Sequence, residues 1–207
     1  LYPCRDFDPE HQLELIDRAI ADGASAIAIV PINARPIREK LNALHAQGYP
    51  VVFLSNIIDD ASCLSFVGCD YYMSGSLAAG MLHLLRPQGG RLLLFSPSFQ
   101  MRGHVLRAQG LEQRLRSSYP EIQLQEVYEL SGDSIADFAL TRQALEKWPD
   151  TDLVVCPGAY SRANLRALAE TAPGAVRSTV CYDHSAQVDA MIRAGQIQTA
   201  LLQSPQD

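Results

Sequence analysis

Short, uninterrupted apolar runs recur along the chain, and longer segments with a helical hydrophobic pattern separate them. The run at residues 26–30 is followed by an amphipathic stretch at 36–47 and then by a second apolar run at 51–54. Short apolar runs of this kind are typical of strands that are covered on both faces. Strands that alternate with helices need crossover connections, so the pattern predicts parallel sheets flanked by helices.

The same alternation continues to the end of the chain, and the expected fold class is therefore α/β. Local signals mark several helix starts, such as Asp8 with Pro9 and, further on, Asp70. The predicted helices are residues 11–21, 36–47, 71–85, 104–116, 134–148, 161–171 and 185–194. The predicted strands are residues 26–30, 51–54, 65–67, 91–95, 122–128, 153–156, 178–182 and 198–202.

The composition is that of a globular protein that builds its own core. Of the 207 residues, 47% are hydrophobic and 19% are charged. The 17 Lys and Arg residues are outnumbered by 23 Asp and Glu, and no basic run is interleaved with aromatic residues, so a nucleic-acid surface is not indicated. No apolar stretch approaches the roughly 20 residues of a membrane span. We therefore expect a partner that is either a small neutral molecule or a protein, and no membrane partner.

The five cysteines are scattered and include no C-x-x-C pair. Three of them lie at the ends of apolar runs, and we interpret these as small core residues rather than catalytic thiols: Cys69, Cys156 and Cys181. An odd set of cysteines without metal or redox spacing indicates a reducing compartment, so the expected localisation is cytoplasmic.

Sequence motifs for catalysis and for common cofactors are missing. The chain contains neither G-x-G-x-x-G nor G-x-x-x-x-G-K-[ST] nor G-x-S-x-G, and no carboxylate cluster or H-x-x-x-H pair offers a metal site. We therefore expect no cofactor, no metal and no enzymatic activity.

Ligands of parallel sheets bind beyond the carboxyl ends of the strands, and two places there stand out. Asp183 and His184 directly follow a predicted strand; they could form a catalytic pair, but no nucleophile accompanies them, and Asp183 also suits a helix cap or an acceptor for ligand hydroxyls. Arg107 lies one turn into a helix that also carries Arg102 and His104 near its start. Its planar guanidinium could hold two hydroxyls or a carboxylate, and the alternative is a solvated helix face.

Several strings along the chain resemble the effector-binding domain of lactose-repressor-type transcriptional regulators, which shares its fold with periplasmic sugar-binding proteins. They are DGASAIAIVPIN at 22–33, GYPVVFLSN at 48–56, SFVGCDYYMSGSLAAGML at 65–82, RAQGL at 107–111, WPDTDLVVCPGA at 148–159, VCYD at 180–183 and AGQIQTALLQSPQ at 194–206. The resemblance covers nearly the whole chain.

The resemblance implies two Rossmann-like lobes with parallel sheets, joined by a three-stranded hinge and closing on a small ligand. Residues 1–69 would form an N-terminal lobe that lacks the first strand and helix of the family, residues 70–203 the C-terminal lobe, and residues 204–207 the start of the hinge return. The hinge crossings would fall near Cys69 and Asp70 and near Gln203 and Ser204.

The resemblance also implies a set of ligand-binding residues: Ser55, Asn56, Arg107, Asp183 and Gln203. A carboxylate and a guanidinium that face each other across a cleft suit a polyol. Two departures argue against an ordinary hexose or pentose: Pro157 and Gly158 replace the Asn-Asp pair common in sugar binders, and Val30 is apolar where a polar residue is expected.

The function implied is that of a ligand-responsive transcriptional repressor. A sugar, polyol or sugar acid would be the effector, and operator DNA would be bound through a helix-turn-helix head that this chain does not contain. The family forms dimers, and the small residues of the segment 71–85, including Gly75, allow either a contact in a homodimer or packing within the same chain. The alternative function is a periplasmic solute-binding protein of a sugar transporter.

Overall fold

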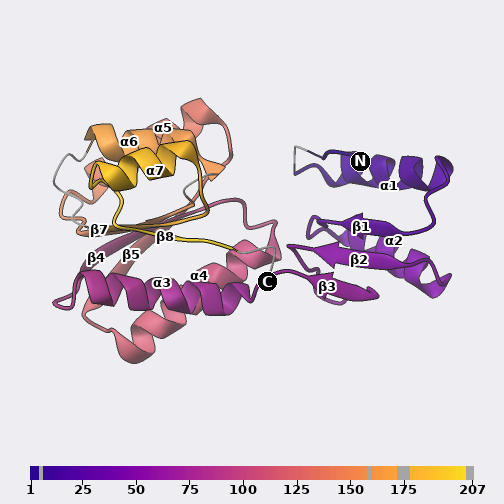
Figure 1. Cartoon of the computed structure of the whole chain (residues 1–207), viewed down its shortest axis with the longest axis horizontal. Helices are drawn as coiled ribbons and strands as arrows, with labels where there is room; N and C mark the ends of the chain where they lie inside the picture. The colour runs from indigo at the N-terminus through magenta and orange to yellow at the C-terminus, as the bar shows by residue number, and fades with distance from the viewer. Residues whose placement is uncertain (5–6, 158–159, 172–177, 204–207) are drawn as a thin grey trace. The chain divides into compact units, whose positions relative to one another are not determined.

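The computed structural model describes residues 1–4, 7–157, 160–171 and 178–203. The chain forms two compact units: unit 1 comprises Leu1–Cys69 with Gln100–Val105, and unit 2 comprises Asp70–Phe99 with Leu106–Asp207. Each unit contains a parallel sheet with helices, which confirms the predicted α/β class (Figure 1). The predicted helices and strands are all present, with ends within two residues of those expected.

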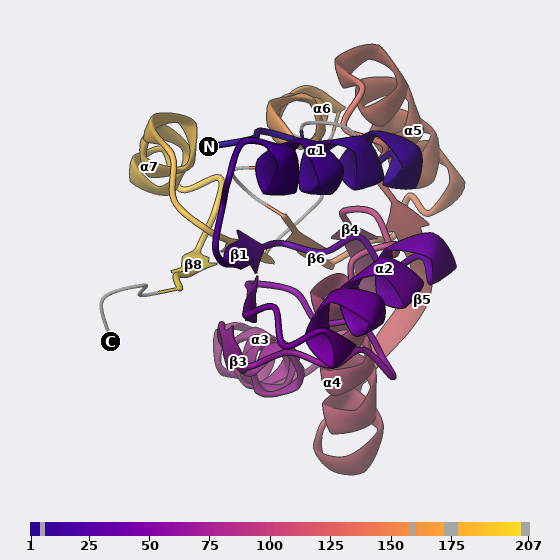
Figure 2. The same cartoon turned by 90° about the vertical axis from the view of Figure 1, so that its right-hand side faces the viewer.

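Unit 1 contains a three-stranded parallel sheet in the order β1-β2-β3. Its elements are α1 (Pro9–Ala21), β1 (Ile27–Ile29), α2 (Arg35–Ala46), β2 (Val51–Leu54) and β3 (Ser65–Val67). The helices α1 and α2 pack against each other, and Figure 2 shows the pair. Their apolar stripes meet the strands in one core, which includes Ile16, Leu41 and Phe53.

The start of α1 follows directly from its sequence. The Asp8 carboxylate accepts a hydrogen bond from the Glu10 N–H, and Pro9 occupies the first helical position, where its missing N–H costs nothing. Gly23 ends the helix in a left-handed conformation with φ +87°.

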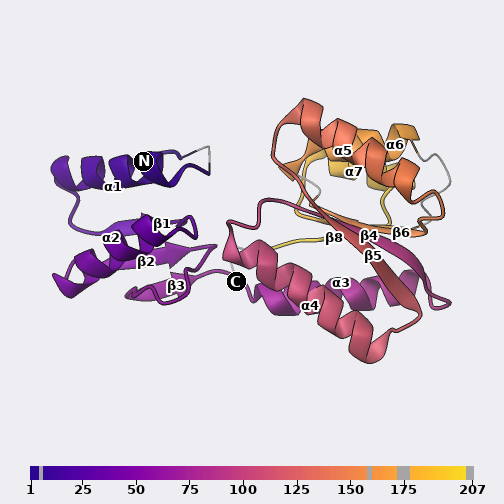
Figure 3. The same cartoon turned by 180° about the vertical axis from the view of Figure 1, so that it is seen from behind.

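Unit 2 contains a five-stranded parallel sheet in the order β5-β4-β6-β7-β8. Its strands are β4 (Gly90–Ser96), β5 (Ile122–Glu129), β6 (Leu153–Cys156), β7 (Ser178–Tyr182) and β8 (Thr199–Leu201). Its helices are α3 (Tyr71–Leu85), α4 (Arg102–Ser118) from Leu106 onward, α5 (Ser134–Lys147), α6 (Arg162–Thr171) and α7 (Ala186–Arg193). Figure 3 shows α3 and α4 on one face of the sheet and α5, α6 and α7 on the other.

Two cores lie on the two faces of this sheet because the buried residues of its central strands are mostly apolar. Successive side chains of a strand point to opposite faces, so Leu93 and Phe95 of β4 join one core and Leu92 and Leu94 join the other. The four residues of β6 are all buried. An unbroken apolar run therefore marks a doubly covered strand here, as the sequence pattern predicted.

Helices α3 and α4 approach closely through two glycines. A Cβ atom on Gly75 would lie 1.9 Å from the Arg107 carbonyl oxygen, and one on Gly110 would lie 2.0 Å from the Tyr72 carbonyl oxygen. The small residues of α3 are thus used inside unit 2, in a contact between helices. A bulky residue at Gly75 would disturb this packing whether or not the protein forms a homodimer.

The cysteine predictions hold for the two strand residues. Cys156 and Cys181 are fully buried, and burial raises the pKa of the Cys181 thiol to about 12, so this thiol is a poor nucleophile. Cys69 differs from the expectation, since it is only partly buried at the end of unit 1.

The segment 100–105 corrects one predicted lobe boundary. We expected it within the lobe 70–203, but it groups with unit 1. Side-chain contacts explain the difference: the Asn56 Oδ1 atom accepts from the Gly103 N–H at 3.0 Å, and Arg102 pairs with Asp59 at 3.2 Å. The expected hinge return at residues 204–207 lies outside the described residues, and the other lobe limits stay predictions.

Candidate functional site

The loops after the strands carry all the sequence-predicted ligand residues except Arg107, which lies on α4. Ser55 and Asn56 follow β2 in unit 1, whereas Asp183 follows β7 and Gln203 follows β8 in unit 2.

In unit 1, the Asn56 side chain is buried and ties three segments together. Its Nδ2 group donates to the Pro31 carbonyl oxygen at 2.6 Å and lies 3.7 Å from the sulfur of Met101, while its Oδ1 atom accepts from the Gly103 N–H. Both ends of the amide are therefore engaged within the protein. In this arrangement Asn56 shapes the loops, and its binding of a ligand stays a prediction.

Ser55 and Asp183 share an unusual backbone conformation. Ser55 has φ +54° and Asp183 has φ +65°, both in the left-handed region that residues other than glycine rarely occupy. In both cases the N–H bonds to the last residue of the next strand along the chain: Ser55 to the Val67 carbonyl at 2.8 Å and Asp183 to the Leu201 carbonyl at 2.9 Å. The two units thus build the same turn at corresponding strand ends.

Asp183 is not the cap of the helix that follows it. The Ser185 hydroxyl has that role and accepts from the Val188 N–H at 3.2 Å. The Asp183 Oδ1 atom instead accepts from the Gln203 Nε2 group at 3.1 Å, so the structure brings these two predicted site residues together. His184 pairs with Asp189 at 3.0 Å, and the possible Asp183–His184 catalytic pair is not formed.

Arg107 is the most unusual polar residue of unit 2. Arg107 is only 9% exposed, and its guanidinium carbon lies 3.9 Å from the ring centre of Tyr182 and 5.2 Å from that of Tyr71. The Nε and Nη2 atoms are buried without a hydrogen-bond partner. The solvated-face interpretation is therefore wrong for Arg107, whereas it fits the exposed Arg114 on the same helix.

The sequence reasoning missed Asp137, a carboxylate in the interior of α5 that is 1% exposed. Its Oδ1 atom accepts from the N–H and the hydroxyl of Ser131, and its Oδ2 atom accepts from the Gly132 N–H and the Ser161 hydroxyl. It thereby ties the loop after β5 to the start of α6. The available sequence signal was the polar string Ser131-Gly132-Asp133. This string indicates a polar loop, and it does not indicate the following helix that carries Asp137.

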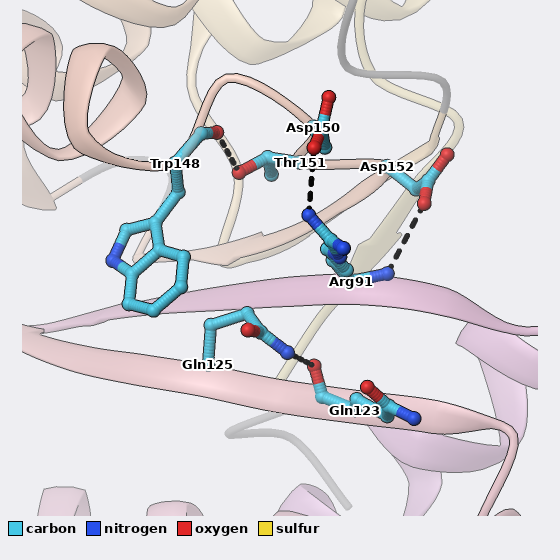
Figure 4. A network of polar contacts seen from close by, with 7 residues as sticks. All are labelled: Arg91, Gln123, Gln125, Trp148, Asp150, Thr151 and Asp152. Carbon is cyan, nitrogen blue, oxygen red and sulfur yellow. Dashed lines mark hydrogen bonds and ion pairs between the residues drawn. The ribbon is translucent and has the colours of Figure 1, made fainter.

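The opposite end of the unit 2 sheet also carries a polar network, in which protein groups bond to one another (Figure 4). Arg91, at the start of β4, pairs with Asp150 at 2.7 Å, and its N–H donates to the Asp152 carboxylate at 3.1 Å. The Thr151 hydroxyl donates to the Trp148 carbonyl at 2.7 Å. These residues lie at the amino ends of parallel strands, away from the usual ligand end, and we interpret them as structural.

The described residues place no three or more His, Cys, Asp or Glu side chains together as a metal site. None of the described helices is both long and apolar enough to cross a membrane. What the unit 2 site offers is a buried cation with open donors, two tyrosine rings and a carboxylate paired with an amide.

Comparison with known proteins assigns the family. Residues 4–207 match the periplasmic binding protein domain. The chain belongs to the periplasmic binding protein family. No curated protein sequence matches it.

Several solved structures share the fold. The periplasmic component of a sugar transport system from Hahella chejuensis has a TM-score of 0.87 at 19% identity, over 97% of this chain and 74% of that one. The Caulobacter myo-inositol binding protein has a TM-score of 0.86 at 18% identity, with coverages of 96% and 69%. An arabinose binding protein from Geobacillus stearothermophilus has a TM-score of 0.74 at 23% identity, with coverages of 92% and 66%.

Proposed function

We propose that this member of the periplasmic binding protein family binds a small polyhydroxylated molecule without converting it. The observation that carries the proposal is Arg107, whose Nε and Nη2 atoms are buried and meet no acceptor. Leaving such donors unpaired costs about 1–3 kcal/mol each, so a ligand that supplies oxygen atoms is stabilising there.

The remaining groups of the site complement the guanidinium. Asp183 presents a carboxylate that accepts hydrogen bonds, and the Gln203 Nε2 group donates one of them. Donors and acceptors in the same site are what paired hydroxyls require. No nucleophile with an adjacent base accompanies them in the described part of unit 2, which supports binding without turnover.

A thermal-shift screen tests the proposal. The probes are myo-inositol, arabinose, glucose and galactose, which the names of structural relatives suggest, together with other polyols and sugar acids. We expect at least one probe to raise the Tm in proportion to the logarithm of its concentration. A flat response to the whole panel, or chromatography that shows a bound probe being chemically converted, would contradict the proposal.

Arg107→Gln and Arg114→Gln form a matched pair for the same screen. Both arginines lie on α4 and both stack on a tyrosine, since the Arg114 guanidinium carbon is 5.4 Å from the Tyr119 ring centre, but Arg114 is exposed. Losing a charged donor to a buried ligand costs about 1.5–3 kcal/mol, so Arg107→Gln should weaken binding at least tenfold. Arg114→Gln should leave the affinity unchanged.

For the protein as a whole, we propose two alternative roles. The names of the structural relatives, which include a sugar transport component and an arabinose binding protein, support a solute-binding protein that delivers its ligand to a transporter. Under this role the full-length protein is exported, and cell fractionation should recover it outside the cytoplasm.

The second role is a cytoplasmic, ligand-responsive regulator that binds operator DNA as a dimer. The strings VGCDYYMSGSLAAG and ALLQSP, together with thiols such as Cys63 and Cys181 that form no disulfide, support it. Under this role the full-length protein stays in the cytoplasm and shifts DNA from its own promoter region in a gel, and the ligand changes that shift. Recovery outside the cytoplasm would rule this role out.

A further inference from the structure

The Arg107 guanidinium forms no ion pair with any carboxylate of the described residues. The hydrogen bonds and ion pairs of the described residues include none at Arg107, and its contacts are the faces of Tyr71 and Tyr182. Ring faces attract a cation through their quadrupole, but they accept no N–H hydrogen bonds in the way that oxygen atoms do. The rings therefore hold the guanidinium in place and leave its charge and its donors for another group.

Buried charges in proteins are normally paired, because removing a lone charge from water is unfavourable. The residue after Tyr182 in the chain is the carboxylate Asp183, yet Asp183 bonds to Gln203 and forms no ion pair with Arg107. A neutral sugar would satisfy the N–H donors and leave the charge unbalanced. A carboxylate satisfies both, and its two oxygens fit the planar fork of a guanidinium.

We propose that the ligand is a polyhydroxylated monocarboxylate, that is, a sugar acid, with its carboxylate at Arg107 and its hydroxyls at Asp183. The inference rests on the proposed function, since it names the charge class of the same ligand. Asp183 fixes the orientation of the ligand. Its negative charge repels the carboxylate end, and its oxygens accept hydrogen bonds from the hydroxyls.

A phosphorylated sugar fits the site less well. A phosphate group carries up to two negative charges and is usually held by several cationic or N–H donors. The lysines Lys40 and Lys147 are paired with Asp17 and Glu126, and Arg102 is paired with Asp59, so these cations are engaged elsewhere. The single positive charge of Arg107 balances the single negative charge of a carboxylate.

Calorimetry with matched neutral and acidic ligands tests the proposal on the purified protein. The pairs are glucose with glucuronate and gluconate, galactose with galacturonate, and arabinose with arabinonate, all at one ionic strength; acetate and glucose 6-phosphate are added as further probes. We expect the acid of at least one pair to bind tenfold or more tightly than its neutral partner, and more tightly than either added probe.

Two variants of Arg107 and one control variant locate the preference. Arg107→Gln should reduce the ratio of acid to neutral affinity to near one, and Arg107→Lys, which keeps the charge but loses the fork, should retain part of it. Arg114→Gln should retain the full ratio. Circular dichroism of each variant without ligand checks its folding, and the wild-type comparison decides the charge class even where a variant is unstable.

The outcomes separate this inference from the function on which it depends. Equal or tighter binding of the neutral sugars overturns the inference and leaves the proposed function intact. Binding of acetate as tight as that of the sugar acid, or tighter binding of glucose 6-phosphate, also overturns it. If no sugar, acid or phosphate binds, the proposed function fails and the inference fails with it.

Discussion

Ser55 and Asp183 hold backbone conformations that cost a non-glycine residue about 1–3 kcal/mol. Both follow a strand directly, and both have their N–H bonded to the neighbouring strand, which fixes the turn. Residues in such conformations cluster at ligand sites, so the φ values support the predicted positions independently of sequence resemblance.

We expect Asp183→Asn to weaken ligand binding without destabilising the protein. The substitution keeps the shape of the side chain but replaces an acceptor oxygen by a donor, which costs about 1–3 kcal/mol against ligand hydroxyls. Asn tolerates the left-handed conformation, and Ser185 continues to cap α7. Calorimetry should show about tenfold weaker binding, while the Tm without ligand stays unchanged; unchanged affinity would remove Asp183 from the site.

Sequence reasoning selected candidate site residues but could not predict their surroundings. Arg107 could be selected because a fork donor near the start of a helix suits a ligand. Its stacking between Tyr71 and Tyr182 could not be predicted, because these tyrosines come from α3 and β7 and meet Arg107 only in the folded unit. Asn56 shows the opposite case: the polar loop position was correct, but tertiary contacts engage its whole amide.

At the scale of elements, the glycine contact between α3 and α4 sets how closely the two helices pack. Gly75→Ala places a methyl group against the Arg107 carbonyl and should destabilise the protein by about 1–3 kcal/mol. Gly80→Ala on the same helix is the control, since the nearest atom to its Cβ lies 3.8 Å away and alanine favours the helix by about 1 kcal/mol. Urea unfolding should therefore show a lower free energy of unfolding for Gly75→Ala and a higher one for Gly80→Ala. Equal changes in the two variants would contradict the packing argument.

Asp137 is the second element-scale feature, because it joins a loop to two helices. Asp137→Asn replaces one acceptor oxygen by an N–H donor that faces donors from Ser131 or from Gly132 and Ser161, so we expect a loss of about 3 kcal/mol. Asp133→Asn on the same turn is the matched control, since Asn caps a helix about as well as Asp. If urea unfolding gives the same small effect for both, Asp137 does not hold the loop.

At the scale of the whole molecule, one carboxylate of β5 contributes to acid sensitivity. Hydrogen bonds from Lys147, Tyr128 and Trp148 lower the pKa of Glu126 to about 2, below its unfolded value of about 4.3. Because the folded pKa is the lower one, this stabilisation is present above about pH 4.3 and is lost as the pH falls toward 2.

Glu126→Gln should therefore make the fall in Tm between about pH 4.5 and pH 2 shallower than in the wild type. Glu146→Gln removes an exposed partner of Arg142 on α5 and should leave the slope unchanged. A Tm profile of Glu126→Gln that parallels the wild type over this range would show that the Glu126 contacts do not contribute.

The α/β class and the element order were predictable because buried strands and amphipathic helices differ in period and length. The grouping of residues 100–105 with unit 1 was not predictable in the same way. It depends on side chains of Asn56 and Asp59 that lie far away in the sequence, and no local pattern encodes such contacts.

The matching turns at Ser55 and Asp183 have an evolutionary consequence. The same backbone turn carries a hydroxyl at Ser55 in one unit and a carboxylate at Asp183 in the other. In both units a main-chain hydrogen bond holds the turn, and this bond involves neither side chain. Exchanging the side chain at such a position changes what is recognised and leaves the scaffold in place. Substitutions at either position can thus change the ligand that is preferred, one residue at a time.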